Sequence, residues 1–334
     1  MRIHYDWRLA RVVDDERNIV DELEWDGPIT PTTLSKRLKI IQGGRNLPEV
    51  STLSERFPEA IIDETGALSD PHWPEIGDLE QVFQKATLEL AKMGIADSSG
   101  DLDRRLDMLV SAAQELRSSW TTSEARCVEW SGLFITEANL DSQRNDIPVA
   151  ISSSRTISEA AEKLGVNPPK HLPSDLEWSS MFSHANTVTR SSEILEQIEN
   201  AIREIASTHS PSLSALLGPI SAAKLISLAG GRERLARMPS GSLQVLGAHA
   251  AMSAHRRGAP PPKHGAVLFS MPQVSRSPRW VRGKIARYLA GKASIAVRVD
   301  NFEGERWDES KIEEINSEIE AIKKKFPRPP KRGV

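Results

Sequence analysis

The sequence predicts a mainly α-helical protein with a small N-terminal α/β domain, a long antiparallel coiled-coil hairpin and an all-α C-terminal domain. Three observations support this class: mixed segments before residue 98, a heptad repeat from Leu102, and short helical segments rich in small residues after Ser210. A chain of 334 residues can form two or three units with their own cores. We therefore expect divisions at 1–98, 99–208 and 209–303, followed by a C-terminal helix and basic tail over 304–334.

The N-terminal domain carries mixed signals. The stretch RIHYDWRLARVV favours strands, ITPTTLSKRLKII favours a capped helix, and DETGALSDPHWPEIGD is rich in turn residues. No motif that would carry chemistry is visible in this part of the chain.

The central part contains a heptad seam whose spacings alternate between 4 and 3 residues. Its members are Leu102, Leu106, Leu109, Ala113, Leu116, Trp120, Ser123, Cys127, Trp130 and Phe134. A second run at Ile194, Ile198, Ala201 and Ile205 repeats the spacing, so the two helices are expected to pair as a hairpin. We predict self-association through the apolar seam: Leu102, Leu106, Leu109, Leu116, Trp120, Ile194, Ile198 and Ile205. Cys127 is interpreted as a packed core thiol.

The C-terminal part reads as a series of short helices. Pro219 marks one start and Gly230-Gly231 its end, and a turn is expected at Pro239–Gly241 before another helix. The segment GAPPPKHG is a stiff loop, and a further helix is expected from about Arg279 to Val299. A final apolar stripe predicts one more helix, with its members at Ile312, Ile315, Ile319 and Ile322.

Charge is segregated along the chain although the net charge is only −3. Residues 211–334 hold 22 Lys and Arg against 10 Asp and Glu, whereas residues 1–210 hold 21 against 36. This asymmetry predicts that the C-terminal part meets a polyanion. The single cysteine excludes an internal disulfide and a multi-cysteine zinc site. We see neither a signal peptide nor a bilayer-length apolar run, so a cytosolic protein without membrane contact is expected.

The most basic stretch is SPRWVRGKIARYLAGK, residues 277–292, which contains no acid. On a helix, Ile285, Leu289, Ala293 and Ala296 form one apolar side. Lys284, Arg287 and Arg298 then fall together on the opposite side. A narrow cationic face without interspersed carboxylates is typical of phosphate binding.

A loop before this helix adds further donors. Lys263 and His264 follow three prolines, and Arg276 and Arg279 flank a second turn. A proline-stiffened loop presents its donors with little ordering cost. His264 could stack on a base or hydrogen-bond to it, although a solvated loop histidine fits equally well.

These segments closely resemble the Nop domain, the RNA-binding module of box C/D ribonucleoprotein scaffold proteins. The resemblance is carried by LLGPISAAKLISLAGGRERLARMPSGSLQVLGAHAAM, PPPKHGAVLF and RGKIARYLAGKASIAVRVDNF. EWSGLF and SKIEEINSEIEAIKKKFPRPPK also look like the archaeal members. The resemblance implies contacts with RNA or its bound protein at Lys263, His264, Arg282, Lys284, Arg287, Lys292 and Arg298. We add Arg276 and Arg279 because they flank the turn before this helix, and Gln244 and His249 as candidate additional contacts.

The resemblance also implies partners and a function. The Nop domain would dock onto a box C/D guide RNA at a kink-turn held by a small ribosomal-type protein, and the N-terminal domain would bind the fibrillarin methyltransferase. Fibrillarin would supply the catalysis, ribose 2′-O-methylation of rRNA or tRNA, so this chain would be a non-catalytic scaffold in an archaeal cytosol. No cofactor or metal is expected in it. One departure stands out: His249 and Ala250 replace the acidic residue and lysine usual in the family.

Two other classes of protein fit the sequence less well. An enzyme is disfavoured because the chain shows no phosphate loop, no G-x-S-x-G elbow, no H-E-x-x-H and no cysteine cluster. A DNA-binding helix-hairpin-helix protein remains the alternative, since LLGPISAAKLISLAGG resembles that motif. However, Pro219 removes an amide at the turn where such a motif needs one.

Overall fold

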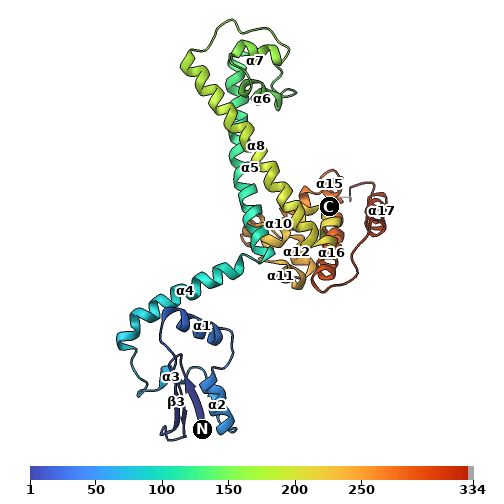
Figure 1. Cartoon of the computed structure of the whole chain (residues 1–334). Helices are drawn as coiled ribbons and strands as arrows, with labels where there is room; N and C mark the ends of the chain where they lie inside the picture. Colours follow the sequence, from blue (N-terminus) through green and yellow to red (C-terminus); the bar gives the residue numbers. More distant parts are fainter. Residues whose placement is uncertain (330–334) are drawn as a thin grey trace. The chain divides into compact units, whose positions relative to one another are not determined.

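The computed structural model describes residues 1–329 (Figure 1). The chain divides into two compact units, Met1–Gly100 and Asp101–Val334. Within the described residues the chain is 64% helical with a small four-stranded sheet, which confirms the predicted mainly α class. The finer division of the second unit stays a prediction, and residues 330–334 of the expected basic tail lie outside the described part.

The sheet of the first unit has the order β3-β2-β1-β4. Its strands are β1 (Arg2–Tyr5), β2 (Leu9–Val13), β3 (Ile19–Glu24) and β4 (Ile61–Asp63). β1 pairs antiparallel with β2, where Ile3 lies opposite Val12, and parallel with β4. The strands expected in RIHYDWRLARVV are therefore present, whereas the sequence analysis identified neither β3 nor β4.

Helices of the first unit supply the apolar side chains that bury the sheet. They are α1 (Pro31–Gln42), α2 (Pro48–Arg56), the short α3 (Gly66–Ser69) and α4 (Glu80–Ser98). The expected cap of α1 is Thr30, whose hydroxyl accepts a 3.2 Å hydrogen bond from the Thr33 amide. One core combines Ile3 and Val12 with Leu53 of α2.

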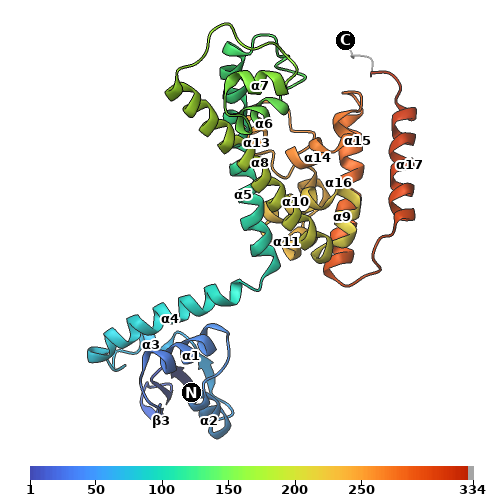
Figure 2. The same cartoon turned by 45° about the horizontal axis from the view of Figure 1, so that its top comes forward.

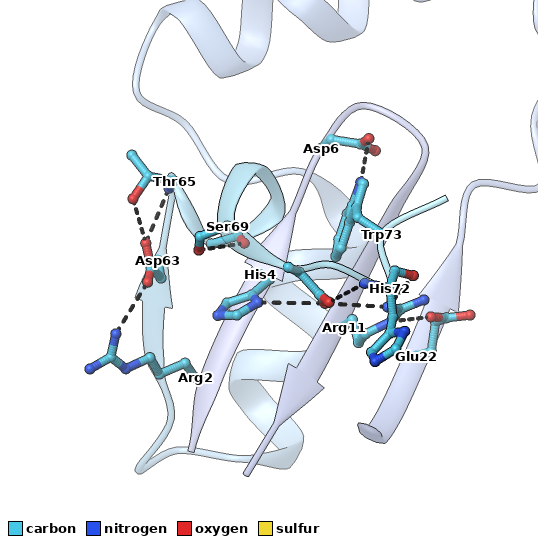
Figure 3. A network of polar contacts seen from close by, with 12 residues as sticks. Arg2, His4, Asp6, Arg11, Glu22, Asp63, Thr65, Ser69, His72 and Trp73 are labelled. Carbon is cyan, nitrogen blue, oxygen red and sulfur yellow. Dashed lines mark hydrogen bonds and ion pairs between the residues drawn. The ribbon is translucent and has the colours of Figure 1, made fainter. Parts of the chain in front are cut away.

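A polar network holds the turn-rich segment after β4 against the sheet (Figure 3). Arg11 of β2 is nearly buried, and its Nε donates a 2.5 Å hydrogen bond to Glu22 of β3. Its guanidinium also lies 5.1 Å from the ring centroid of Trp73 and pairs with Asp70 at 3.4 Å. The Trp73 indole donates to Asp6 at 2.8 Å. These contacts satisfy a buried charge and fix an otherwise irregular segment.

The second unit begins with a long hairpin. α5 (Leu102–Phe134) and α8 (Asp175–His209) run side by side, and α6 (Asp146–Ser152) and α7 (Ile157–Lys163) lie at the far end of the pair (Figure 1). The connection between the two long helices has its own core, in which Ile147, Ile151 and Ala160 are fully buried. This end of the hairpin is therefore a small helical cluster.

The rest of the unit consists of α16 (Arg282–Asn301) and a set of shorter helices, most of which pack against it. They are α9 (Pro211–Leu217), α10 (Pro219–Ala229), α11 (Arg232–Arg237), α12 (Ser240–Gln244), α13 (His249–Arg256), α14 (Ala266–Ser270), α15 (Pro272–Ser275) and α17 (Glu309–Lys325). Their core is continuous with the base of α5 and α8 through Leu106 and Ile202.

Two helix boundaries differ from the prediction. The expected start of α16 at Arg279 is wrong, because the Val281 amide donates to the Pro278 carbonyl in a turn before the helix. The single helix expected after Pro239 is two helices, α12 and α13. They are separated near Gly247, whose φ of +81° interrupts helical geometry.

Asp103, near the start of α5, joins the hairpin to the C-terminal helices. Its carboxylate lies 2.7 Å from His209 Nε2 at the end of α8 and accepts a 2.9 Å hydrogen bond from the Arg232 amide of α11. Burial alone would raise the pKa of Asp103, but the hydrogen bonds from His209 and Arg232 outweigh it and lower that pKa. The hairpin base is thereby held on the helices that pack against α16.

No single helix within residues 1–329 has both the length and the apolar character needed to cross a bilayer. Helices α9 and α10 meet that criterion only when taken together, and they are bent by 116° at Gly218.

Candidate RNA and protein interface

Helix α16 has the two faces that its sequence predicts. Ile285, Leu289, Ala293 and Ala296 are buried in the core of the second unit. Lys284, Arg287 and Arg298 are exposed on the other side. The buried side fixes the orientation of the helix, so these three cations face outward.

The cations of the predicted interface have no carboxylate partner. Within residues 1–329, no Asp or Glu oxygen lies within the 4.0 Å of an ion pair from any of them. The set comprises Lys263, Arg276, Arg279, Arg282, Lys284, Arg287, Lys292 and Arg298. Elsewhere in the same unit cations do pair, for example Arg237 with Glu233 at 2.5 Å. A group of uncompensated charges favours binding of an external anion.

Aromatic rings and carbonyl groups hold four of these side chains instead: Arg282, Lys284, Lys292 and Arg298. Lys284 Nζ lies 4.2 Å from the ring centroid of Phe326, and Lys292 Nζ lies 5.4 Å from that of Tyr288. Arg298 Nε donates a 2.9 Å hydrogen bond to the Ala236 carbonyl. Such partners orient a cation without neutralising it.

The loop that carries Lys263 and His264 is pinned at both ends. Gln244 Nε2 donates a 2.6 Å hydrogen bond to the Lys263 carbonyl, and the Gly265 amide donates to the Gln244 carbonyl at 2.7 Å. A Cβ at Gly265 would collide with the Leu246 carbonyl oxygen. Gln244, expected as an additional contact, is nearly buried and shapes this loop.

His264 of this loop and Arg282 of α16 both contact one aromatic ring, that of Phe269. The His264 ring stacks on Phe269 of α14, with centroids 4.7 Å apart and an interplanar angle of 11°. The Arg282 guanidinium lies 5.6 Å from the same Phe269 ring. The sequence pattern does not predict a role for Phe269. Its only signal there is its position directly after the segment HGAVL. Arg276 and Arg279 are exposed in the segment that leads into α16.

His249, the other additional contact, begins α13. Most of this helix is exposed, including His249 and the neighbouring Ala250. No hydrogen bond or ion pair of the His249 side chain occurs within the described residues.

Helix α17 lies beside α16 (Figure 2). Its Ile315 and Ile319 are fully buried, as the predicted stripe requires. Burial raises the pKa of Tyr288 on α16, and the carboxylates of Glu318 and Glu314 on α17 raise it further. Acidic groups of α17 therefore act on the Tyr288 and Lys292 side of α16.

Residues of the expected self-association seam are partly buried by contacts within the chain itself. Leu106 is fully buried. The other seam residues are half-buried: Leu102, Leu109, Leu116, Trp120, Ile194, Ile198 and Ile205. The fully buried positions between the helices lie next to them, at Val110, Leu195 and Ile202. The seam thus leaves apolar surface along the edges of the hairpin.

Cys127 is buried in the core at the far end of the hairpin. Burial raises the pKa of its thiol to about 11, so the thiolate that a nucleophile needs is scarce near neutral pH.

The turn between α9 and α10 is the segment that resembles a helix-hairpin-helix motif. Gly218 has a φ of +80°, and Pro219 follows it as the first residue of α10. The helices on both sides are largely buried, with Leu216, Leu217 and Ala222 in the core. Gly218, Pro219 and Ile220 themselves are half-buried, but Pro219 has no amide hydrogen to donate to a DNA phosphate. Within the described part of the chain no group of three or more His, Cys, Asp or Glu residues could hold a metal ion.

Comparisons with known proteins agree on one family. Residues 132–324 match the family described as "Nop: snoRNA binding domain, fibrillarin". An uncharacterized NOP5 family protein of Methanocaldococcus jannaschii is 31% identical over 70% of this chain and 57% of its own length. Nucleolar protein 56 of Caenorhabditis elegans is 37% identical over 39% of this chain and 26% of its own length.

The match covers little more than half the length of the Methanocaldococcus jannaschii protein and about a quarter of the length of the Caenorhabditis elegans protein. A solved chain from a fibrillarin/Nop5p complex is similar over 91% of this chain and 97% of its own length, with 21% identity and a TM-score of 0.43.

Proposed function

The chain belongs to the Nop family, and on that premise we propose that it is the non-catalytic scaffold of a box C/D guide RNA–protein complex. Its C-terminal helices bind a kink-turn RNA together with the small ribosomal-type protein that holds it. The family description names both snoRNA binding and fibrillarin, which supports the two sides of this role.

One observation carries the RNA-binding proposal. The outward cations of α16 and the Lys263 loop have no carboxylate partner within residues 1–329, although the chain as a whole has more acids than bases. Lysine and arginine that lie along a phosphate backbone release condensed counterions, which favours binding and makes it depend on salt. The stacked His264 adds a group suited to a base rather than to a phosphate.

The other parts of the chain would position the catalyst. We propose that the first unit binds the fibrillarin methyltransferase and that the hairpin associates with a second copy through its half-buried apolar edge. Fibrillarin then transfers a methyl group to a ribose 2′-hydroxyl selected by guide-RNA pairing. This chain supplies no catalytic group, cofactor or metal, and acts in the cytosol of an archaeon.

Reconstitution with one component left out at a time tests this role. The components are this chain, fibrillarin, the kink-turn-binding protein and a box C/D RNA, with methylation of a guide-matched RNA as the readout. We expect methylation only when all four are present. Activity without fibrillarin would contradict the non-catalytic role, and full activity without this chain would contradict the scaffold.

A binding experiment separates the alternative. The chain is titrated against duplex DNA and against kink-turn RNA with its protein bound. Preference for the RNA–protein complex supports the proposal, whereas equal or tighter binding to duplex DNA would favour the helix-hairpin-helix class.

A further inference from the structure

Phe269 is an exposed aromatic ring inside the cationic surface. It is 38% exposed, although Val267 and Leu268 beside it in α14 are buried in the core. α14 is thus anchored while one large ring faces outward. A single exposed apolar side chain is common on protein surfaces, so the contacts of this ring, rather than its exposure, point to a site.

The ring is already part of a stack. His264 lies parallel to it at 4.7 Å, and the Arg282 guanidinium lies 5.6 Å from its centroid. Arg282 is fixed in turn, since its Nε donates a 2.8 Å hydrogen bond to the Ser277 carbonyl. Three flat groups therefore lie together before any ligand is bound.

The residues around this stack are already held in place, which reduces the conformational entropy lost when a ligand binds. Hydrogen bonds from Gln244 and to its carbonyl fix the residues on either side of His264. The nearby cations, Lys263 and Arg282, lack carboxylate partners in the described chain. A preorganised site loses little conformational entropy on binding.

We propose that Phe269, with His264 and Arg282, is a stacking site for an unpaired nucleobase of the bound RNA. Unpaired bases stack on aromatic rings and on guanidinium planes, while neighbouring cations bind the attached phosphates. A peptide side chain could also stack on the ring, but the free cations favour a ligand that carries phosphate. This site rests on the proposed RNA-binding function and adds base recognition to an otherwise electrostatic surface.

Phe269→Leu tests the site in the full chain, because leucine keeps the apolar character and removes the flat ring. Phe302→Leu is the matched control, since Phe302 is a 64% exposed phenylalanine at the other end of α16. Affinity is measured for kink-turn RNA with its protein bound, at several salt concentrations. The RNAs carry an abasic site at one unpaired position at a time, and thermal unfolding verifies that both variants fold.

We expect Phe269→Leu to weaken binding about tenfold, as for the loss of one stacked base. Phe302→Leu should leave affinity unchanged. The dependence of binding on salt should match that of the wild type. On the RNA that lacks the stacked base, Phe269→Leu should cause no additional loss of affinity.

Two results would overturn the site while leaving RNA binding intact. One is that Phe269→Leu binds with the same affinity as Phe302→Leu. The other is that Phe269→Leu loses the same affinity on every abasic RNA, which would mean that the ring contacts the protein partner. Absence of binding by the wild-type chain would instead refute the proposed function, and this site with it.

Discussion

The ammonium group of Lys284 lies 4.2 Å from the ring centroid of Phe326. A residue just after α17 therefore already contacts one cation of the α16 surface. The Phe326 carbonyl also accepts a 2.9 Å hydrogen bond from the Trp280 indole, which anchors this segment in front of α16. A phosphate that binds Lys284 must therefore share this cation with the ring or displace it.

Replacing Phe326 tests that competition. Phe326→Ala removes the ring but keeps the carbonyl that binds Trp280. Because the ring also packs against the core of the second unit, thermal unfolding must verify that the variant folds. Cation–π contacts at exposed sites contribute about 0.5–1 kcal/mol, so affinity for the RNA–protein complex should rise about two- to fivefold. The measurement is an equilibrium titration. A fall in affinity would show that the ring helps to present Lys284.

Lys284 and Arg287 themselves should contribute to RNA binding through charge-assisted contacts. Alanine at either position should weaken assembly by about 1 kcal/mol or more. Each replacement should also make the dependence of binding on salt shallower, because fewer counterions are released. Titrations over a range of salt concentrations measure both effects.

Arg237→Ala is the control for that pair, since Arg237 is exposed but already paired with Glu233. It should change neither affinity nor slope. If the Lys284 and Arg287 double variant keeps the slope of the wild type, the α16 face does not contact RNA.

Self-association should depend on the half-buried edge of the hairpin. Leu109→Asp places a charge on the predicted seam, so the dimer should dissociate while the C-terminal helices remain folded. Met108→Asp is the control, because Met108 is the adjacent residue and 64% exposed. Sedimentation velocity reports the mass. An unchanged mass for Leu109→Asp would mean that the seam packs only within one chain.

Folding must be followed in the same experiment, because Leu109 also packs against the core that α5 shares with the C-terminal helices. A cooperative thermal transition in Leu109→Asp would show that loss of the dimer is not loss of the fold.

The sequence predicted the buried side of α16 because Ile285 and Leu289 belong to a helical repeat that only one face can satisfy. It placed the hairpin seam less accurately. Ile194 and Leu195 are both apolar neighbours, and packing between two chain segments, rather than spacing alone, decides that Leu195 is the buried one. The sequence of one helix cannot predict which of its residues are buried when burial depends on a segment far away in the chain.

The stack around Phe269 shows the same limit at the site. Its members come from a loop, from α14 and from α16, and the hydrogen bonds of Gln244 bring the loop into place. No local repeat connects these positions, so only the folded chain brings them together. The charges at Lys284 and Arg287, by contrast, could be placed on one face from helical geometry alone.

The junction at Asp103 predicts how stability depends on pH. Its pKa is lowered in the folded chain, so the folded state favours the carboxylate form more than the unfolded state does. The stabilisation is fully present above the ordinary aspartate pKa of about 3.9 and is lost as pH falls through the lowered folded value. Asp103→Asn should cost about 1–3 kcal/mol at pH 7, because hydrogen bonds to a charged group are replaced by weaker ones.

Urea unfolding at pH 7 and at pH 3 to 4 measures both effects. The free energy of unfolding should fall less steeply with acid in Asp103→Asn than in the wild type. Glu162→Gln, which changes an exposed carboxylate on α7, should follow the wild-type curve. If the two variants lose stability equally with acid, the contacts of Asp103 with His209 and Arg232 do not hold the hairpin base in place.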